Sequence, residues 1–491
     1  MRRRIVAATL AVMVGVAAGC TRAEFVPARD PAPSPSAGAS GGPTGATQGG
    51  APGGIGSDGI GDSYFPKAGN GGYDVASYDL DLRYEPRTDT LTGTAKITAS
   101  ATADLTRFNL DLKDLAVRSA TVDGKAAQTR ASGEELVVTP TAGIASGARF
   151  VVEIRYGGVP KPYAEPGLGE IGFLHTPEGA IAIGEPQVAA SWFPVNDHPR
   201  DKATYTFRIT APAGLAALAN GALKGRKTAG GVTTWTWVES RPMASYLATV
   251  VIGLYRLQES THDGKPVVIA VDTSLPETID RQMARTPEIV DFLESKFGPY
   301  PFDALGGIVI NDGRIRFALE NQSRPIYSNA FFEGNGNDGT WVIVHELAHQ
   351  WYGDSVALAD WKDIWLNEGF ATYAEWLWGE SRGEPAQSQF DGLYGRVSSP
   401  LWKVPPGNPG ASRLFDASVY VRGGMTLHAL RMTLGDPAFF TILKSWAAEK
   451  AHGNATTPEF IALAERVSGR QLDTLFRDWL YGTRRPPRPS R

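Results

Sequence analysis

Two histidines and two glutamates between residues 345 and 368 constrain the fold of this chain more than any other feature. Residues 345–349 read HELAH, and Glu368 follows the second histidine by nineteen positions. On a helix, positions i and i+4 lie on the same face, so His345 and His349 can point at one ion. Glu368 lies on a second predicted helix, reached after a turn near residues 353–354. The pattern therefore requires two helices that meet in space.

These residues have the chemistry of a zinc site. Two imidazoles and one carboxylate are common zinc ligands, and three protein ligands leave a fourth position for water, as in catalytic sites. Glu346 is offset from His345 by about 100° around the helix. It is therefore placed to reach that water as a general base rather than to bind the ion. The alternative is a buried helix with two core histidines, but such a helix would require neither Glu346 nor Glu368.

Length, charge and cysteine content narrow the class of protein. The 491 residues exceed what one hydrophobic core usually holds and suggest two or three domains. The net charge of -4 argues against a nucleic-acid-binding protein. The single cysteine excludes a disulfide within the chain.

Residues 1–20 resemble a bacterial lipoprotein signal peptide. Three arginines follow Met1, and residues 5–16 form an apolar stretch that is too short to span a membrane. The sequence VAAGC then ends at Cys20, the only cysteine, and resembles a lipobox. We expect Cys20 to be lipidated and the protein to be exported and anchored to the cell membrane, facing the extracellular or periplasmic side. A plain signal peptide with an incidental cysteine is the alternative.

Two changes of pattern follow the signal peptide. Residues 21–62 are rich in Pro, Gly and Ser, which predicts a disordered linker that cannot bury a core. Residues 63–258 contain short alternating apolar and polar runs separated by turns. That pattern predicts an N-terminal antiparallel β-sandwich.

Residues 259–485 combine a few strands with many helical periods. We expect a small sheet with strands near 267–271 and 307–310. Helical spacing covers residues 277–297, 340–352, 364–379, 425–434, 437–450, 458–467 and 472–481. A small sheet followed by a helical lobe resembles a thermolysin-like domain, so the fold class is multidomain α+β. Residues 486–491 form a basic tail.

Several further segments carry a resemblance to one family. They read WFPVNDHP at 192–199, FGPYPF at 297–302, FALEN at 317–321, WLNEGFA at 365–371 and YVRGG at 420–424. Together with HELAH and Glu368, they resemble motifs of the aminopeptidase N family of gluzincin zinc metallopeptidases. The motifs occur in the family's order across most of residues 70–485.

The resemblance implies roles that spacing alone does not give. Glu185 and Glu320 would hold the free α-ammonium of a peptide, in a substrate site that includes Ala318 and Asn321. Tyr420 would donate its hydroxyl to the oxyanion of the reaction.

The implied activity is zinc-dependent removal of the N-terminal residue from peptides. One Zn²⁺ per chain would be held by His345, His349 and Glu368, with Glu346 as general base. Glu375, about two turns beyond Glu368, is either a hydrogen-bond partner of a ligand histidine or part of a solvated face.

The chain also departs from the family pattern. Phe317 and Leu319 replace a Gly and a Met, and Phe317 is expected to narrow or reshape the substrate cleft. His198 and Val195 replace a Glu and a Cys. The chain also stops where the family usually continues with a large C-terminal helical domain, so we expect a short form of the family. Three alternatives to the aminopeptidase stay open: an endopeptidase on the same zinc site, another hydrolase there, and a non-catalytic zinc-containing binding protein.

Overall fold

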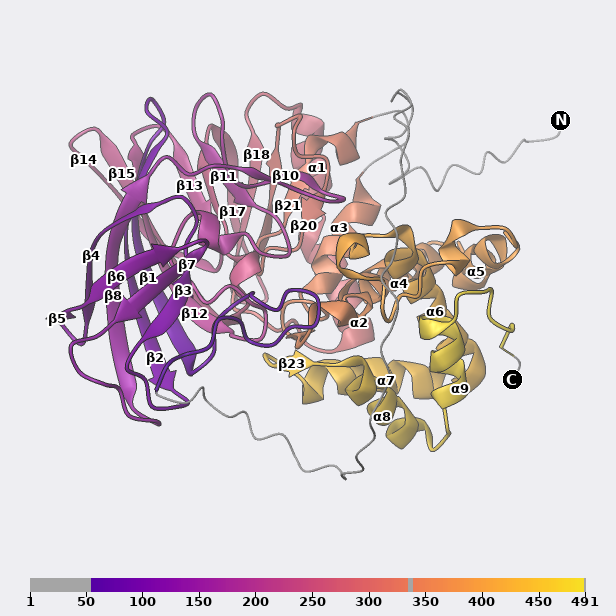
Figure 1. Ribbon diagram of the computed structural model, residues 1–491. Helices are drawn as coiled ribbons and strands as arrows, with labels where there is room; N and C mark the ends of the chain where they lie inside the picture. Colours follow the sequence, from indigo (N-terminus) through magenta and orange to yellow (C-terminus); the bar gives the residue numbers. More distant parts are fainter. Residues whose placement is uncertain (1–53, 334–338, 490–491) are drawn as a thin grey trace, which may run out of the picture. The chain divides into compact units, whose positions relative to one another are not determined.

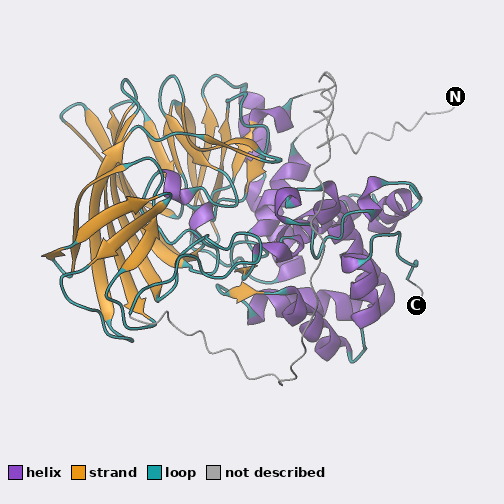
Figure 2. Ribbon diagram, viewed as in Figure 1, coloured by secondary structure: helices purple, strands orange, loops and turns teal. Residues whose placement is uncertain are grey.

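The computed structural model describes residues 54–333 and 339–489 (Figure 1). The predicted signal peptide, Cys20 and most of the predicted linker lie outside the described residues. Strands fill the N-terminal half of the described chain, and helices fill most of the C-terminal half, as Figure 2 shows. This order confirms the predicted α+β class.

The largest sheet has eight strands in the order β14-β15-β12-β1-β2-β8-β4-β5. Its strands are β1 (Tyr73–Glu85), β2 (Thr90–Ala101), β4 (Ala116–Val122), β5 (Lys125–Ala126), β8 (Arg149–Gly158), β12 (Ala203–Pro212), β14 (Ala222–Ala229) and β15 (Val232–Met243). All neighbours are antiparallel except β1 and β12, which pair in parallel. The prediction of a purely antiparallel domain is wrong at this pair, because alternation fixes which face is buried but not strand direction.

Two smaller antiparallel sheets complete the β-rich part. One has the order β13-β16-β11-β10-β9, and the other has the order β3-β7-β6. Their strands are β3 (Phe108–Asp111), β6 (Gln128–Ser132), β7 (Glu135–Thr139), β9 (Tyr163–Glu165), β10 (Gly169–His175), β11 (Ala180–Ile183), β13 (Ala216–Ala219) and β16 (Val250–Gly253). Every residue of β11, β13 and β16 is buried, so this sheet lies inside the molecule.

A third sheet opens the helical part, in the order β17-β18-β19-β21-β20. It contains β17 (Tyr255–His262), β18 (Lys265–Asp272), β19 (Leu305–Ile310), β20 (Ala318–Leu319) and β21 (Ile326–Ser328). The strand β17 starts four residues before the predicted domain boundary at 259. The parallel pair β18–β19 is joined through α1 (Glu277–Met283) and α2 (Thr286–Phe297), the usual crossover for parallel strands. The single helix expected at 277–297 is therefore two helices.

The remaining helices follow the sequence pattern closely. They are α3 (Thr340–His349), α4 (Trp365–Ser381), α5 (Ala386–Tyr394), α6 (Gly423–Leu434), α7 (Asp436–Glu449), α8 (Thr457–Ser468) and α9 (Asp473–Phe476), with π-helical turns at Ser418–Arg422 and Arg477–Tyr481. The sequence did not predict α5, which buries only Ala386, Phe390 and Leu393. Within residues 54–333 and 339–489, no helix has the length and apolarity needed to cross a membrane.

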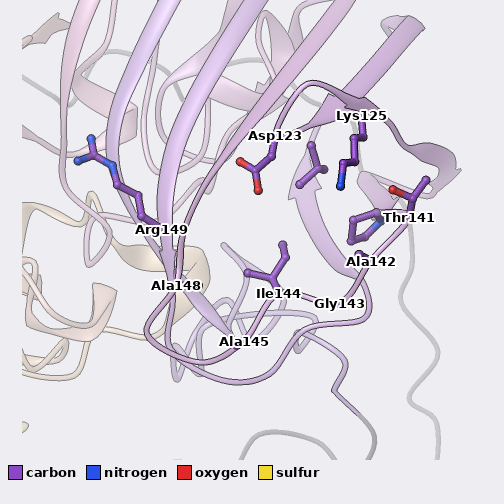
Figure 3. Close-up of a pocket in the computed structure, with 11 residues that line it drawn as sticks. Asp123, Lys125, Thr141, Ala142, Gly143, Ile144, Ala145, Ala148 and Arg149 are labelled. Atoms are coloured by element: carbon purple, nitrogen blue, oxygen red, sulfur yellow. The ribbon is translucent and has the colours of Figure 1, made fainter.

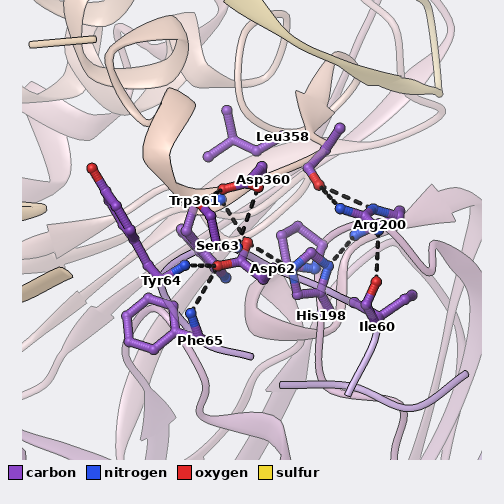
Figure 4. Close-up of polar contacts among 12 residues, drawn as sticks. Ile60, Asp62, Ser63, Tyr64, Phe65, His198, Arg200, Leu358, Asp360 and Trp361 are labelled. Atoms are coloured by element: carbon purple, nitrogen blue, oxygen red, sulfur yellow. Dashed lines mark hydrogen bonds and ion pairs between the residues drawn. The ribbon is translucent and has the colours of Figure 1, made fainter. Parts of the chain in front are cut away.

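Residues 60–65 contact both the β-rich part and the helical part, and we call them the N-terminal clasp (Figure 4). The buried Asp62 carboxylate lies 3.1 Å from Nε2 of His198 and accepts a 2.8 Å hydrogen bond from the Trp361 backbone N–H. Ser63 donates its hydroxyl to Asp360 at 2.7 Å. Ordered contacts thus begin inside the range 21–62 that composition predicted to be a disordered linker.

The basic tail also makes contacts as far as the structure describes it. Tyr394 on α5 donates its hydroxyl to the carbonyl of Pro486 at 2.8 Å, and Arg488 pairs with Asp391. The tail therefore lies against α5 up to residue 488.

Candidate active site

The helix α3 carries the HELAH residues through the hydrophobic core. The side chains of Val342, Ile343, Val344 and Leu347 are buried around it, and so are those of His345, Glu346 and His349. Buried polar side chains are costly unless they are paired or bind an ion. The three titratable side chains on this buried helix therefore need hydrogen-bond partners or a bound ion.

Glu368 on α4 supplies the partner for both histidines. Its Oε2 atom lies 3.1 Å from Nε2 of His345 and 3.5 Å from Nε2 of His349. Zinc–ligand bonds of about 2.0–2.1 Å in a tetrahedral arrangement would place neighbouring donor atoms about 3.3 Å apart. Burial alone would raise the pKa of Glu368, but the two histidines lower it to about 2, so the carboxylate is charged. The donor set therefore fits a zinc ion in both chemistry and spacing.

The other nitrogen of each histidine ring has its own partner. Nδ1 of His345 lies 2.7 Å from a carboxylate oxygen of Glu375, and Nδ1 of His349 lies 3.1 Å from the carbonyl oxygen of Tyr352. Both partners accept hydrogen bonds, so each ring keeps its proton on Nδ1 and presents Nε2 to the ion. Of the two sequence interpretations of Glu375, the structure therefore supports the hydrogen-bond partner.

A close helix contact brings α4 into place. Gly369 follows Glu368 directly, and a Cβ atom added there would lie 2.9 Å from the backbone of Gly423 on α6. Any side chain at residue 369 would push the two helices apart and move Glu368. The start of α4 is fixed as well, because the buried Trp365 indole donates to the Thr457 hydroxyl at 2.8 Å.

Glu346 sits beside the ligands without joining them. Burial raises its pKa, and although His345 and His349 act in the opposite direction, its pKa is still raised from 4.5 to about 8. Its carboxylate, a carboxylate oxygen of Glu320 and a nitrogen of His349 all lie within 4.8 Å of one another. A carboxyl group in this position can accept and return a proton near neutral pH.

Tyr420 reaches the cluster from the π-helical turn Ser418–Arg422. Its ring stacks on the His345 ring with centroids 6.1 Å apart and planes at 22°. Burial and the charge of Glu368 raise its pKa well above 10, so the phenol remains a hydrogen-bond donor. The turn is held by the buried Arg422, which donates to the carbonyls of Trp402, Val404, Trp479, Asp478 and Gly482. Tyr420 is thus a fixed donor next to a metal-ligand ring.

Two carboxyl groups from different parts of the chain lie near enough to the cluster to interact with each other through their charges. Glu185 follows β11, Glu320 follows β20, and both are at least 97 % buried. Burial and the nearby charge of Glu320 raise the pKa of Glu185 well above its usual value. Among the described residues, Oε1 of Glu185 has no hydrogen-bond partner. A buried pair of acids with an unused acceptor is suited to a cationic ligand.

The neighbours of Glu320 have structural contacts of their own. Ala318 lies on β20, and Asn321 donates its side-chain amide to the Leu247 carbonyl at 2.9 Å. Phe317 is 6 % exposed and packs in the hydrophobic core, so the structure gives no support to the expectation that it narrows an open cleft.

Sequence reasoning missed Tyr246, whose hydroxyl donates to Oε1 of Glu320 at 2.9 Å. It is one of 16 tyrosines, and no local pattern distinguishes it. Nor did any sequence pattern assign a role to His198, which the structure pairs with Asp62.

A separate pocket lies in the β-rich part (Figure 3). The β4–β5 turn and the β7–β8 loop line it, with Asp123, Lys125, Thr141 and Arg149 as its polar side chains. None of the three candidate metal-ligand groups in the described residues falls in this pocket. Two of these groups contain residues of α3 and are buried, whereas the third, His262, Asp263 and Asp291, is half-buried to exposed.

A β-rich domain followed by a helical domain that carries a His–His–Glu cluster is the arrangement found in two-domain metallopeptidases. Residues 75–247 match the Peptidase M1 N-terminal domain, and residues 281–479 match the Peptidase family M1 domain. The M1 zinc metallopeptidase of Deinococcus radiodurans is 31 % identical with a TM-score of 0.81, over 88 % of this chain and 99 % of that chain. The chain belongs to peptidase family M1.

Two further similarities bear on function. A mutant of the Deinococcus radiodurans enzyme, solved with the substrate Tyr-Ser-Ala, is 32 % identical with a TM-score of 0.81, over 88 % of this chain and 99 % of that chain. Aminopeptidase M1 of Arabidopsis thaliana is 27 % identical over 437 residues, which are 82 % of this chain and 49 % of that protein. The chain spans about half the length of the curated relatives that it matches.

Proposed function

We propose that this protein is a zinc-dependent aminopeptidase that removes the N-terminal residue from peptides. The observation that carries the proposal is the buried pair Glu185 and Glu320 beside the ligand cluster. Its members come from the two domains. A metal-ligand cluster alone would suit any hydrolase, whereas two adjacent carboxylates select a substrate with a free ammonium group.

The residues present would hold and use one zinc ion. His345, His349 and Glu368 would bind it, and bound zinc would lower the pKa of a water molecule and polarise the scissile carbonyl. Glu346 then takes a proton from the attacking water and passes it to the leaving amine. Tyr420 donates its hydroxyl to the oxygen that becomes negatively charged.

The carboxylate pair explains why one residue would be removed at a time. An ammonium group held by Glu185 and Glu320 sets how far the first peptide bond lies from the metal ligands. Only the bond nearest the N-terminus then reaches Glu346. Two-domain M1 zinc metallopeptidase structures solved with L-tryptophan and with L-arginine support this interpretation, because free amino acids are the products of such a reaction.

The test compares free and blocked substrates. We expect hydrolysis of aminoacyl-7-amido-coumarins, and a fall by orders of magnitude when the substrate amine is acetylated, since acetylation removes the charge that two buried carboxylates require. Glu320→Ala should narrow this difference by harming the free-amine substrate more. Equal cleavage of both substrates, or cleavage mainly at internal bonds, would instead identify an endopeptidase on the same site.

We also propose that the protein is an exported lipoprotein anchored through Cys20. The support is the sequence alone: a basic start, a short apolar stretch and a lipobox-like VAAGC that holds the only cysteine. In membrane fractionation, Cys20→Ser should release the protein from the membrane fraction. A variant that stays fully membrane-associated would contradict the anchor.

A further inference from the structure

We propose that Tyr246 is a positioning residue for Glu320, and that it holds this carboxylate in the orientation that receives a substrate ammonium. The inference rests on the proposed function, because it concerns how the same site recognises a free N-terminus. Tyr246 belongs to the short 3₁₀ helix η2 (Ser245–Leu247), which follows β15 at the end of the β-rich domain. Glu320 belongs to the catalytic domain, so the hydrogen bond between them crosses the domain boundary.

The hydrogen bond itself is of ordinary length and is buried. The Tyr246 hydroxyl donates to Oε1 of Glu320 at 2.9 Å, and both side chains are at least 97 % buried. Within the described part of the chain, no hydrogen bond involves Oε2 of Glu320. The Tyr246 hydroxyl therefore binds Oε1 of Glu320 and leaves Oε2 for a ligand. A donor that fixes the plane of the carboxylate is expected to act in this way.

The chain at Glu320 and Asn321 is fixed from two directions. The Asn321 side chain donates to the Leu247 carbonyl at 2.9 Å, next to Tyr246. The Gln350 side chain, at the end of α3, donates to the Glu320 carbonyl at 2.9 Å. With its backbone held by η2 and α3, Glu320 retains only side-chain rotation, and the Tyr246 hydroxyl restricts that rotation.

The Tyr246 ring is held in turn by the catalytic domain. The Trp361 ring meets it edge-on, with centroids 5.3 Å apart and planes at 65°. Trp361 donates its backbone N–H to Asp62 of the N-terminal clasp at 2.8 Å. A well-packed ring places its hydroxyl reproducibly, which suits a donor that must orient a carboxylate.

The need for such a donor follows from the local charge. When Glu185 and Glu320 are both ionised and no cation is bound, they repel each other, and each would gain by turning away. A hydrogen bond to the charged form of Glu320 opposes that rotation before substrate arrives. The charges of Glu368 and Glu346 also act on Glu185, so the site holds more negative charge than this pair alone.

The experiment is a double-mutant cycle with Tyr246→Phe, Glu320→Ala and the double variant. The readouts are kcat and KM for a free-amine peptide and the inhibition constant of its N-acetylated form, so the blocked ligand is measured even where it is not cleaved. We expect Tyr246→Phe to lower kcat/KM for the free-amine peptide by about ten- to a hundredfold, the usual range for a hydrogen bond to a charged group. The inhibition constant of the acetylated peptide should stay within about twofold, and the effect should vanish in the Glu320→Ala background.

A matched control separates positioning from folding. Tyr73 also donates a buried hydroxyl, to the Asn109 carbonyl at 2.6 Å, but it lies in the β-rich domain away from the cluster. Tyr73→Phe should lower Tm without changing the preference for a free amine. If Glu320→Ala narrows the preference but Tyr246→Phe does not, the positioning role alone is refuted. If Glu320→Ala leaves the preference unchanged, the proposed function fails and the role of Tyr246 fails with it.

Discussion

Glu375 lies 2.7 Å from Nδ1 of His345, while Glu368, two turns earlier on the same helix, lies 3.1 Å from Nε2 of that ring. One helix thus contacts both nitrogens of a single imidazole. The outer carboxylate fixes the proton on Nδ1 and increases the electron density that Nε2 offers to a metal. This arrangement gives Glu375 a role that can be measured.

Replacing Glu375 should weaken zinc binding without unfolding the protein. We expect Glu375→Gln to lower zinc affinity or kcat by about 10- to 100-fold, because the amide orients the ring but cannot stabilise its charge. Zinc titration by a competing chelator measures the affinity, and Glu449→Gln, which removes an exposed partner of Arg466, is the control. Unchanged zinc affinity and unchanged kcat in Glu375→Gln would contradict the role.

Glu346 should be needed for turnover but not for the metal. We expect Glu346→Gln to retain one zinc per chain and to lower kcat by more than the ~10²–10⁴ of general acid–base catalysis, since the same group also orients the water. His349→Ala is the contrasting variant and should lose the zinc. Elemental analysis measures the zinc content, and steady-state kinetics measure kcat. Near wild-type turnover in a zinc-loaded Glu346→Gln variant would rule out Glu346 as the general base.

Tyr420 should act mainly in the transition state. Its ring stacks on the ring of His345 from the π-helical turn Ser418–Arg422, so Tyr420→Phe keeps this packing and removes only the hydroxyl donor. We expect kcat to fall by ~10²–10³ with little change in KM, as for other oxyanion donors. Steady-state kinetics measure both constants, and a change confined to KM would assign Tyr420 to substrate binding.

Stability should fall in mild acid because of His428. Burial, followed by the charge of Arg431, lowers the pKa of this core histidine from 6.5 to about 4. Between these values the unfolded chain binds a proton that the folded chain excludes, so the free energy of unfolding is fully present above pH 6.5 and is lost as pH falls toward 4. The loss is at most about 3 kcal/mol. Denaturant unfolding at several pH values should show that the free energy of unfolding depends less on pH in His428→Gln than in the wild type. The same pH dependence in both proteins would contradict the role of His428.

The ligand cluster could be predicted because its geometry follows from the spacing of its residues. Residues four apart on a helix share a face, so HELAH alone predicts that His345 and His349 lie together. Glu375 shows the limit of that logic. The spacing of Glu368 and Glu375 places both on one side of α4. Only the packing of α3 against α4 determines that Glu375 contacts a histidine and not solvent.

Contacts between distant segments could not be predicted in the same way. The Tyr246–Glu320 hydrogen bond joins residues 74 positions apart, and the Asp62–Trp361 bond joins residues 299 positions apart. Neither leaves a periodic signal in the sequence. Composition was misleading for residues 54–62. This stretch is rich in Gly and resembles a linker, but its buried Asp62 contacts His198 and the backbone N–H of Trp361.

The N-terminal clasp sets a practical limit on how far this protein can be trimmed. The match to the Peptidase M1 N-terminal domain begins only at residue 75, downstream of Asp62, Ser63 and Tyr64. A shortened protein that starts there would leave His198 and the Trp361 N–H facing an empty buried space at the junction of two domains. Recombinant versions made for crystallisation or assays should therefore keep the chain from residue 54 onward, even though this stretch lies outside the recognised domains.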